Sequence, residues 1–319
     1  MNSEQRIEFK PINSGYNRVF KLGKLSLGLV VPIENYDNAS IPSMQRHIER
    51  VQLAEKLGFS AVWLRDIPFN VPSFGDAGQL YDPFVYLGAL ALQTRQIALG
   101  VSSVILPLRH PSHIAKSAAT ADQLSQGRLI LGIASGDRPE EYPAHNIIFE
   151  NRGERFRESY EYIRAMATTS PTINNSFGHL HGKLEMFPKP VSDQIPMLVT
   201  GISQQSEDWI AKNTNGWITY PKAENIQRQL IEKYRSLSRA ASLMEKPVME
   251  PLYIDLLPDD DASPTPIHLG LRLGIKHLRN YLKIRRNIGV NHIALNLRFN
   301  RSDPETTIKK LANELLPDV

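Results

Sequence analysis

The chain has 319 residues, of which 41% are hydrophobic and 22% are charged, so we expect a packed globular protein. The length suits one large barrel or two ordinary domains. Its 37 basic and 33 acidic residues give a net charge of +4, which is too balanced to predict binding to nucleic acid or to an anionic membrane. The absence of cysteine excludes disulfides, thiolate metal sites and a cysteine nucleophile.

The first residues lack the apolar core of a secretory signal, and the longest apolar stretch, near 25–33, is too short to span a membrane. We therefore expect a cytoplasmic protein with no membrane contact. Residues 1–24 are polar with scattered aromatic side chains, which predicts an N-terminal arm that lies over the main domain.

After residue 24, strand and helix patterns alternate along the chain. Continuous apolar runs predict strands that are covered on both faces, and apolar side chains at helical spacing predict the helices between them. In the first half we expect strands at 25–32, 61–66, 97–106 and 129–134, with helices at 43–57, 83–94, 114–124 and 151–167.

The second half begins with a pause in this alternation. Residues 168–195 are rich in Pro, Gly and Asn without a helical period, which predicts a loop or hairpin insertion after the fourth helix. Beyond it we expect strands at 197–200, 217–220, 252–257 and 292–297, and helices from 206, at 226–237, at 269–288 and from 303.

Eight strands that are each followed by a helix predict an α/β protein with a single (β/α)8 TIM barrel over residues 25–319. A doubly wound open sheet uses the same units. However, no Gly-x-Gly-x-x-Gly motif follows the first strand, which favours the barrel.

Three segments carry a more specific signal: Leu-Pro-Leu-Arg-His-Pro at 106–111, Asp-Gln-Leu-Ser-Gln-Gly-Arg at 122–128, and Ser-Gly-Asp at 135–137. In this order and spacing they resemble the bacterial luciferase-like monooxygenase family of flavin-dependent oxidoreductases. The resemblance runs from about Leu22 to the C-terminus. It implies a TIM barrel that binds FMN.

The active site of a barrel lies at the carboxyl ends of its strands. This rule selects Pro32, Glu34, Asp66, 102–109, 134–138, 200–203, Tyr220 and 296–298. Among them, Ser102-Ser103 matches the family position of a non-proline cis peptide beneath the flavin ring. The following bond, Ser103-Val104, is the alternative.

Thr200-Gly201-Ile202-Ser203 combines a strand that ends in Gly with a Ser that we expect to open the next helix. Free backbone amides and a hydroxyl group at such a turn are suited to binding a phosphate. The resemblance places the flavin phosphate here and implies help from Arg155. Arg152, one helical turn away, competes for that role.

Asp66 ends the second predicted strand. The resemblance implies a contact with the pyrimidine ring of the flavin, whereas an ion pair with Arg65 or another cation at the barrel rim is the structural alternative. Pro68 stands where luciferases have their catalytic histidine, so we assign no catalytic residue. The remaining clusters, His179 with His181 and the three aspartates 259–261, lack the ligands or spacing of a metal site.

The resemblance implies an FMN-dependent monooxygenase that receives reduced FMN from a separate flavin reductase and uses oxygen to oxygenate a small organic substrate. Three alternatives stay open: hydride transfer with a deazaflavin, a flavin-binding barrel without turnover, and a non-redox barrel that acts on sugar phosphates. The resemblance also implies a homodimer, and the insertion at 168–195 is a candidate lid.

Overall fold

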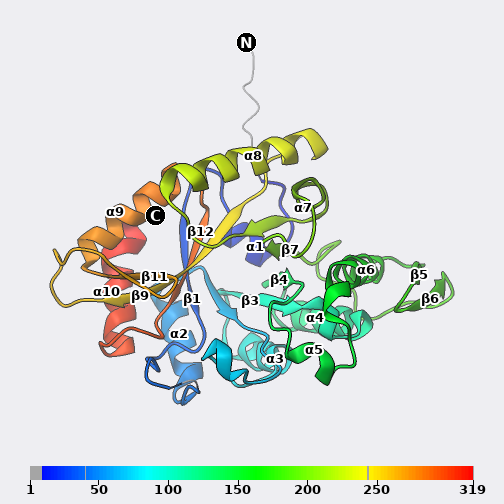
Figure 1. The fold of residues 1–319 in the computed structure, drawn as a ribbon, viewed down its shortest axis with the longest axis horizontal. Helices are drawn as coiled ribbons and strands as arrows, with labels where there is room; N and C mark the ends of the chain where they lie inside the picture. The colour runs from blue at the N-terminus through cyan, green and yellow to red at the C-terminus, as the bar shows by residue number, and fades with distance from the viewer. Residues whose placement is uncertain (1–8, 40, 243, 319) are drawn as a thin grey trace, which may run out of the picture.

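The computed structural model describes residues 9–39, 41–242 and 244–318, so the first eight residues of the predicted N-terminal arm lie outside the described residues. Its centre is a closed barrel of parallel strands in which each strand pairs with the next and the last pairs with the first (Figure 1). The eight strands are β1 (Ser26–Val30), β2 (Ala61–Leu64), β3 (Ala98–Ile105), β4 (Leu129–Ala134), β7 (Met197–Thr200), β8 (Gly216–Ile218), β9 (Val248–Leu256) and β12 (His292–Asn296). The predicted (β/α)8 barrel is confirmed.

A helix follows each barrel strand and covers the outside of the barrel. These helices are α2 (His47–Leu57), α3 (Pro83–Gln93), α4 (Pro111–Leu124), α6 (Arg152–Ala165), α7 (Glu207–Asn213), α8 (Glu224–Ser242), α9 (Ile275–Asn287) and α10 (Pro304–Leu315). Alternate side chains of each strand belong to two cores. In β2, for example, Val62 and Leu64 pack with the helices, whereas Ala61 and Trp63 fill the barrel interior. No helix among the described residues is both long and apolar enough to cross a lipid bilayer.

The segment before β1 contributes to the interior core. Its helix α1 (Ser14–Val19) places Tyr16 and Val19 in the same buried cluster as Trp63. The Tyr16 hydroxyl donates to the carbonyl of Asn215 (2.8 Å), directly before β8. The side-chain amide Nδ2 of Asn13 donates to the carbonyl of Leu129 (2.8 Å), at the start of β4. Because both bonds reach strand beginnings, α1 closes the amino-terminal end of the barrel and leaves the opposite end for a site.

A buried histidine lies inside the barrel at this closed end. The Trp63 indole donates to Nε2 of His292 (2.8 Å), and Nδ1 of His292 is 2.7 Å from the Ser26 hydroxyl. Gly100 leaves room for the indole, since a Cβ there would lie 2.2 Å from the Trp63 ring. Complete burial lowers the pKa of His292 to about 3.

Acidification is expected to destabilise the protein through His292. Between pH 6.5 and 3 the unfolded chain binds a proton that the folded chain excludes, so stability is highest above pH 6.5 and falls as the pH is lowered. This group alone costs about 2 kcal/mol at pH 5. Urea unfolding at pH 7 and pH 5 measures the loss. His292→Gln should reduce the pH dependence, whereas His179→Gln, at an exposed position, should leave it unchanged. An equal loss in wild type and His292→Gln would contradict this origin.

The insertion at 168–195 contains an antiparallel hairpin, β5 (Thr172–Asn175) and β6 (Gly178–His181), which projects from the barrel beside α6 (Figure 1). Of the two predicted forms of this insertion, a loop or a hairpin, the hairpin is therefore confirmed. A short helix, α5 (Glu141–Ala144), precedes α6.

The predicted helix at 269–288 is wrong over residues 269–274. Residues 265–273 form a second hairpin, β10 (Thr265–Ile267) and β11 (Gly270–Leu273), and α9 begins only at Ile275. β11 pairs in parallel with the last residues of β9, from Tyr253 to Leu256. Gly270 permits this pairing, because a Cβ there would lie 1.9 Å from the carbonyl oxygen of Tyr253. The contact joins distant segments, so helical periodicity alone did not show it.

Candidate functional site

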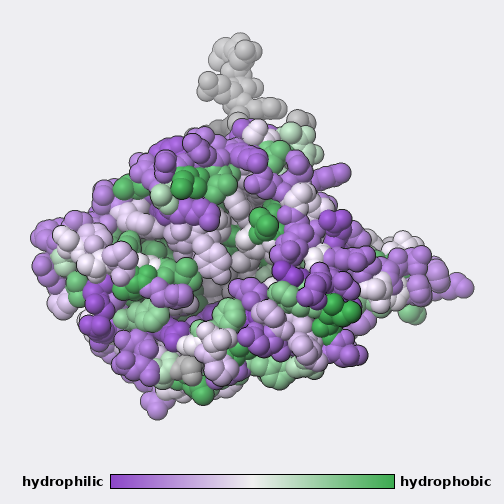
Figure 2. Space-filling model, in the orientation of Figure 1, coloured by the Kyte–Doolittle hydropathy of each residue, from purple (hydrophilic) through white to green (hydrophobic). Residues whose placement is uncertain are grey.

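A cavity of about 800 Å³ opens at the carboxyl ends of the barrel strands. Its size is within the usual range of small-molecule and cofactor sites. Figure 2 shows the surface hollowed near the centre of the barrel, with hydrophobic and hydrophilic residues intermixed around the hollow. Six of the seven predicted cofactor residues line this cavity: Asp66, Ser102, Ser103, Gly201, Ile202 and Ser203. Arg155 does not line it, and neither does any residue of the candidate lid at 168–195.

Ser102 and Ser103 lie near the carboxyl end of β3, and the peptide bond between them is cis, as predicted. The register of β3 against β4 shifts between Val101 and Val104, which produces an irregularity at the two serines. The Ser103 hydroxyl makes a short hydrogen bond to the Thr200 hydroxyl at the end of β7. The cavity floor thus links β3 and β7 through two small polar side chains.

The turn after β7 has the backbone of an anion-binding loop. Gly201, Ser203 and Gln204 have φ values of 57°, 44° and 61°. Within the described residues, the amides of Ile202, Ser203 and Gln204 donate no hydrogen bond, whereas the Gly201 amide donates to Ile218 (2.9 Å). Successive unpaired amides in such a turn form a concave site for an anion.

Ser203 differs from its predicted role as the residue that opens the next helix. Its hydroxyl donates to the carbonyl of Thr200 (2.8 Å) and accepts from the Ser135 amide (3.3 Å). Ser206 is the N-cap instead: its hydroxyl accepts from the Trp209 amide, and α7 begins at Glu207. The backbone of Ser203, rather than a helix cap, is what remains available to a ligand.

Helix α6 holds this turn in place. Gly153 permits the close approach, since a Cβ there would lie 2.7 Å from Cβ of Gln204. Gln205 completes the joint: its Nε2 donates to the carbonyl of Gly153 (2.8 Å), and its Oε1 accepts two bonds from Arg157 (3.0 and 2.9 Å). The side chain of Asn151 caps no amide of this helix, and a 3-10 turn at Phe149–Asn151 leads into it.

The two candidate arginines of α6 point to different places. Arg152 lines the cavity, donates to the carbonyl of Phe149 (3.0 Å), and has a buried Nε without a hydrogen-bond partner among the described residues. Arg155 also has a buried Nε without a hydrogen-bond partner among the described residues, but it does not line the cavity and instead lies over the ring of Phe177 in the β5–β6 hairpin at 4.5 Å. Arg152 therefore fits a cavity ligand better than Arg155.

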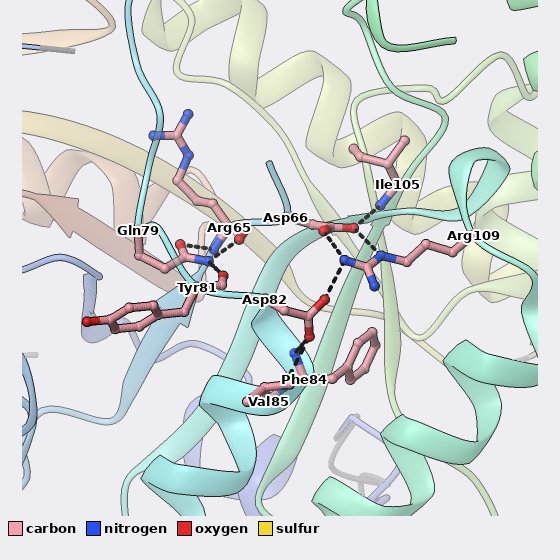
Figure 3. Close-up of polar contacts among 9 residues, drawn as sticks. All are labelled: Arg65, Asp66, Gln79, Tyr81, Asp82, Phe84, Val85, Ile105 and Arg109. Atoms are coloured by element: carbon pink, nitrogen blue, oxygen red, sulfur yellow. Dashed lines mark hydrogen bonds and ion pairs between the residues drawn. The ribbon is translucent and has the colours of Figure 1, made fainter. Parts of the chain in front are cut away.

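The carboxylate of Asp66 accepts three hydrogen bonds at the cavity rim (Figure 3). It accepts from Nη2 and Nε of Arg109 (2.7 and 3.1 Å) and from the amide of Ile105 (3.2 Å). Arg109 also binds Asp82 (2.8 Å), whose other contacts are the first amides of α3. The side chain of Asp66 is only 1% exposed. Of the two interpretations of Asp66, the ion pair is present, with Arg109 rather than Arg65.

Arg65 belongs to a second network, centred on Asp76. Arg65 and Arg298 reach the same carboxylate oxygen of Asp76 at 2.5 and 3.1 Å, and the Tyr36 hydroxyl donates to the other (3.2 Å). Burial opposes the charge of Asp76, but Arg65 and Arg298 outweigh it and hold the pKa of Asp76 below its usual value. Sequence analysis had selected Arg298 by its strand-end position but not Asp76, which lies in a long loop.

A third charged pair faces the cavity after β4. Arg138 lies over the ring of Phe74 at 4.6 Å, and its Nη1 is 3.8 Å from Oε1 of Glu141. Burial raises the pKa of Glu141, although Arg138 and the amide of Phe69 oppose the shift. The strand-end rule had selected Arg138. It missed Glu141, which lies on α5, and also His268 and Leu269, which join the cavity from the tip of the β10–β11 hairpin.

The sequence matches the family model described as luciferase-like monooxygenase over residues 25–253. An uncharacterized protein of Mycobacterium tuberculosis (strain ATCC 25618 / H37Rv) is 34% identical over 191 residues, which cover 55% of this chain and 67% of that protein. The alkanal monooxygenase beta chain of Photorhabdus luminescens is 26% identical over 198 residues, which cover 61% of this chain and 60% of that one.

Solved structures share the fold at low identity. Monooxygenase RslO1 from Streptomyces bottropensis has a TM-score of 0.77 at 20% identity and covers 92% of this chain and 99% of its own. An F420-dependent secondary alcohol dehydrogenase has a TM-score of 0.75 at 17% identity, with coverage of 92% and 98%. The oxygenating constituent of 3,6-diketocamphane monooxygenase from Pseudomonas putida, solved with FMN, has a TM-score of 0.69 at 16% identity, with coverage of 93% and 99%. With the family match over most of its barrel, the chain belongs to the luciferase-like monooxygenase family.

Proposed function

We propose that this protein is an FMN-dependent monooxygenase that oxygenates a small organic substrate at the mouth of the barrel. The observation that carries the proposal is the set of unpaired polar groups at the end of the cavity next to β7 and α6. There, three unpaired amides at 202–204 lie on a turn that α6 holds in place, and Arg152 contributes a buried, unpaired Nε. These groups fit the phosphate of FMN, and Ser102-Ser103 offers a small-residue surface to its ring.

In this proposal the bound reduced flavin supplies the oxygen chemistry, and the protein supplies binding, orientation and exclusion of water. The backbone at 202–204 and Arg152 hold the phosphate. Asp66 stabilises the rim of the cavity through its ion pair with Arg109 and does not contact the reacting atoms. The alkanal monooxygenase relative supports a monooxygenase reaction, and the diketocamphane monooxygenase solved with FMN supports this cofactor. We further propose a separate flavin reductase as partner and a cytoplasmic location.

The second candidate is hydride transfer with a deazaflavin, which the likeness to the F420-dependent alcohol dehydrogenase favours. Anaerobic titration with reduced FMN and with F420, followed by admission of oxygen, separates the two. A monooxygenase should bind reduced FMN and alter its rate of reoxidation relative to free FMN in the same buffer. Tight binding of F420 without binding of FMN would favour the deazaflavin enzyme. FMN binding with the reoxidation rate of free FMN would favour a barrel that binds flavin without turnover.

We also propose that the protein is a homodimer that pairs through α3. The outer side of this helix is apolar and uncovered: Val85 is 75% exposed and Leu92 is 60% exposed, and Gly88 between them has open space beside it. Apolar side chains that repeat along one exposed helix face are typical of an interface.

The double variant Val85→Asp with Leu92→Asp is expected to dissociate this dimer, because burying two carboxylates in an apolar interface is costly. Sedimentation equilibrium should show twice 36.0 kDa for the wild type and 36.0 kDa for the variant. Leu184→Asp, which changes another exposed leucine, should leave the dimer intact. A wild type of 36.0 kDa at micromolar concentration would contradict the dimer.

A further inference from the structure

The Arg138 and Glu141 pair differs from every other charged contact of the cavity. Arg65 and Arg298 both bind Asp76, and Arg152 donates to a backbone carbonyl. Arg138, by contrast, is 8% exposed and donates no hydrogen bond to any described residue. A buried guanidinium without hydrogen bonds is costly, which points to a ligand as its missing partner.

Glu141 has a buried acceptor atom that lacks a donor. It is 3% exposed, and its Oε1 accepts no hydrogen bond within the described part of the chain. This oxygen is 3.8 Å from Nη1 of Arg138, which is beyond hydrogen-bond distance. Both residues line the cavity. The pair therefore offers one unpaired donor and one unpaired acceptor side by side.

We propose that Arg138 and Glu141 recognise the substrate by a carboxamide or lactam edge, whose carbonyl oxygen accepts from Arg138 while its adjacent N–H donates to Glu141. This inference rests on the proposed function, since it names the substrate class of the same cavity. The ring of Phe74 lies 4.6 Å from Cζ of Arg138 and packs against one side of the guanidinium.

A carboxylate ligand would satisfy Arg138 but not Glu141. It would place a second negative charge against Oε1 of Glu141, and the charges of Asp66 and Asp137 also act on this carboxyl group. An amide edge satisfies both partners without adding charge. The rest of the ligand would meet apolar or aromatic cavity residues, of which Ile202, Tyr220 and Leu269 are partly exposed. The structure thus favours an uncharged amide with an apolar body.

The test uses two matched probes, 4-fluorobenzamide and 4-fluorobenzoate, whose binding to the FMN-loaded protein is measured by ligand-observed fluorine NMR at pH 8. The wild type should bind the amide at least ten times more tightly than the carboxylate. Arg138→Met should weaken amide binding at least tenfold, and Arg138→Lys, which keeps the charge but not the planar donors, should give a smaller loss. Glu141→Gln keeps an acceptor and removes the charge, so it should retain amide binding within about threefold and improve carboxylate binding.

Arg228→Met removes an exposed arginine that pairs with Glu224 on α8 and should change neither probe. FMN affinity, measured separately by flavin fluorescence, should stay within about threefold in the Arg138 and Glu141 variants. A tenfold loss of FMN affinity would assign the pair to the cofactor and overturn the proposal. Equal binding of the two probes by the wild type, or no binding of 4-fluorobenzamide, would overturn it as well. The same two probes are also measured against the protein without FMN. If FMN does not bind, the proposed function is refuted, and the comparison of amide and carboxylate binding still tests this proposal.

Discussion

Replacing Arg109 by Met is expected to lower the free energy of unfolding by about 3–5 kcal/mol. The variant leaves the carboxylate of Asp66, with a side chain only 1% exposed, without its cation. The amide of Ile105 would be its one remaining donor of the three bonds seen in Figure 3. Urea unfolding at pH 7 measures the loss.

The double variant Arg109→Met with Asp66→Asn is the matched control, because it removes both charges together. It should recover much of the stability lost by Arg109→Met alone. A single variant that loses less than about 1 kcal/mol would show that Asp66 is not held mainly by this ion pair. Asp66 would then regain its alternative role as a contact of the flavin ring.

Replacing Arg152 by Ala is expected to weaken FMN binding by about 1.5–3 kcal/mol, the range for a hydrogen bond to a charged group. Its guanidinium lines the cavity and keeps a buried nitrogen without a partner in the described structure. Quenching of flavin fluorescence measures the affinity.

Arg155→Ala is the matched control on the same helix. Because Arg155 stacks on Phe177 outside the cavity, its removal should change FMN affinity less than about threefold. A large loss with Arg155→Ala and none with Arg152→Ala would return the phosphate contact to Arg155. It would also mean that the β5–β6 hairpin takes another position when FMN is bound.

The barrel was predictable from the sequence because buried parallel strands appear as short continuous apolar runs, each followed by an amphipathic helix. Strand ends also located Ser102, Ser103 and the turn at 201–203, since any barrel gathers these positions at one mouth. The hairpin at 265–273 was not predictable in this way. Its second strand pairs with β9 through a tertiary contact that overrides the helical pattern of 269–273.

The polar contacts of the site depended on loops, and loops leave little periodic signal. Asp76 lies in the long connection between β2 and α3, so its role between Arg65 and Arg298 could not be read from spacing. The choice between Arg152 and Arg155 was equally hidden. The two are three residues apart on one helix, and only the structure shows that Arg152 lines the cavity whereas Arg155 lies over Phe177.

Native mass spectrometry after incubation with FMN, with F420 or with neither tests the central claim most directly, because it reports whether the barrel holds a flavin and which one. The account predicts the mass of one FMN added per chain, loss of that addition in Arg152→Ala, and its retention in Arg155→Ala. A chain that takes up neither FMN nor F420 would contradict the account.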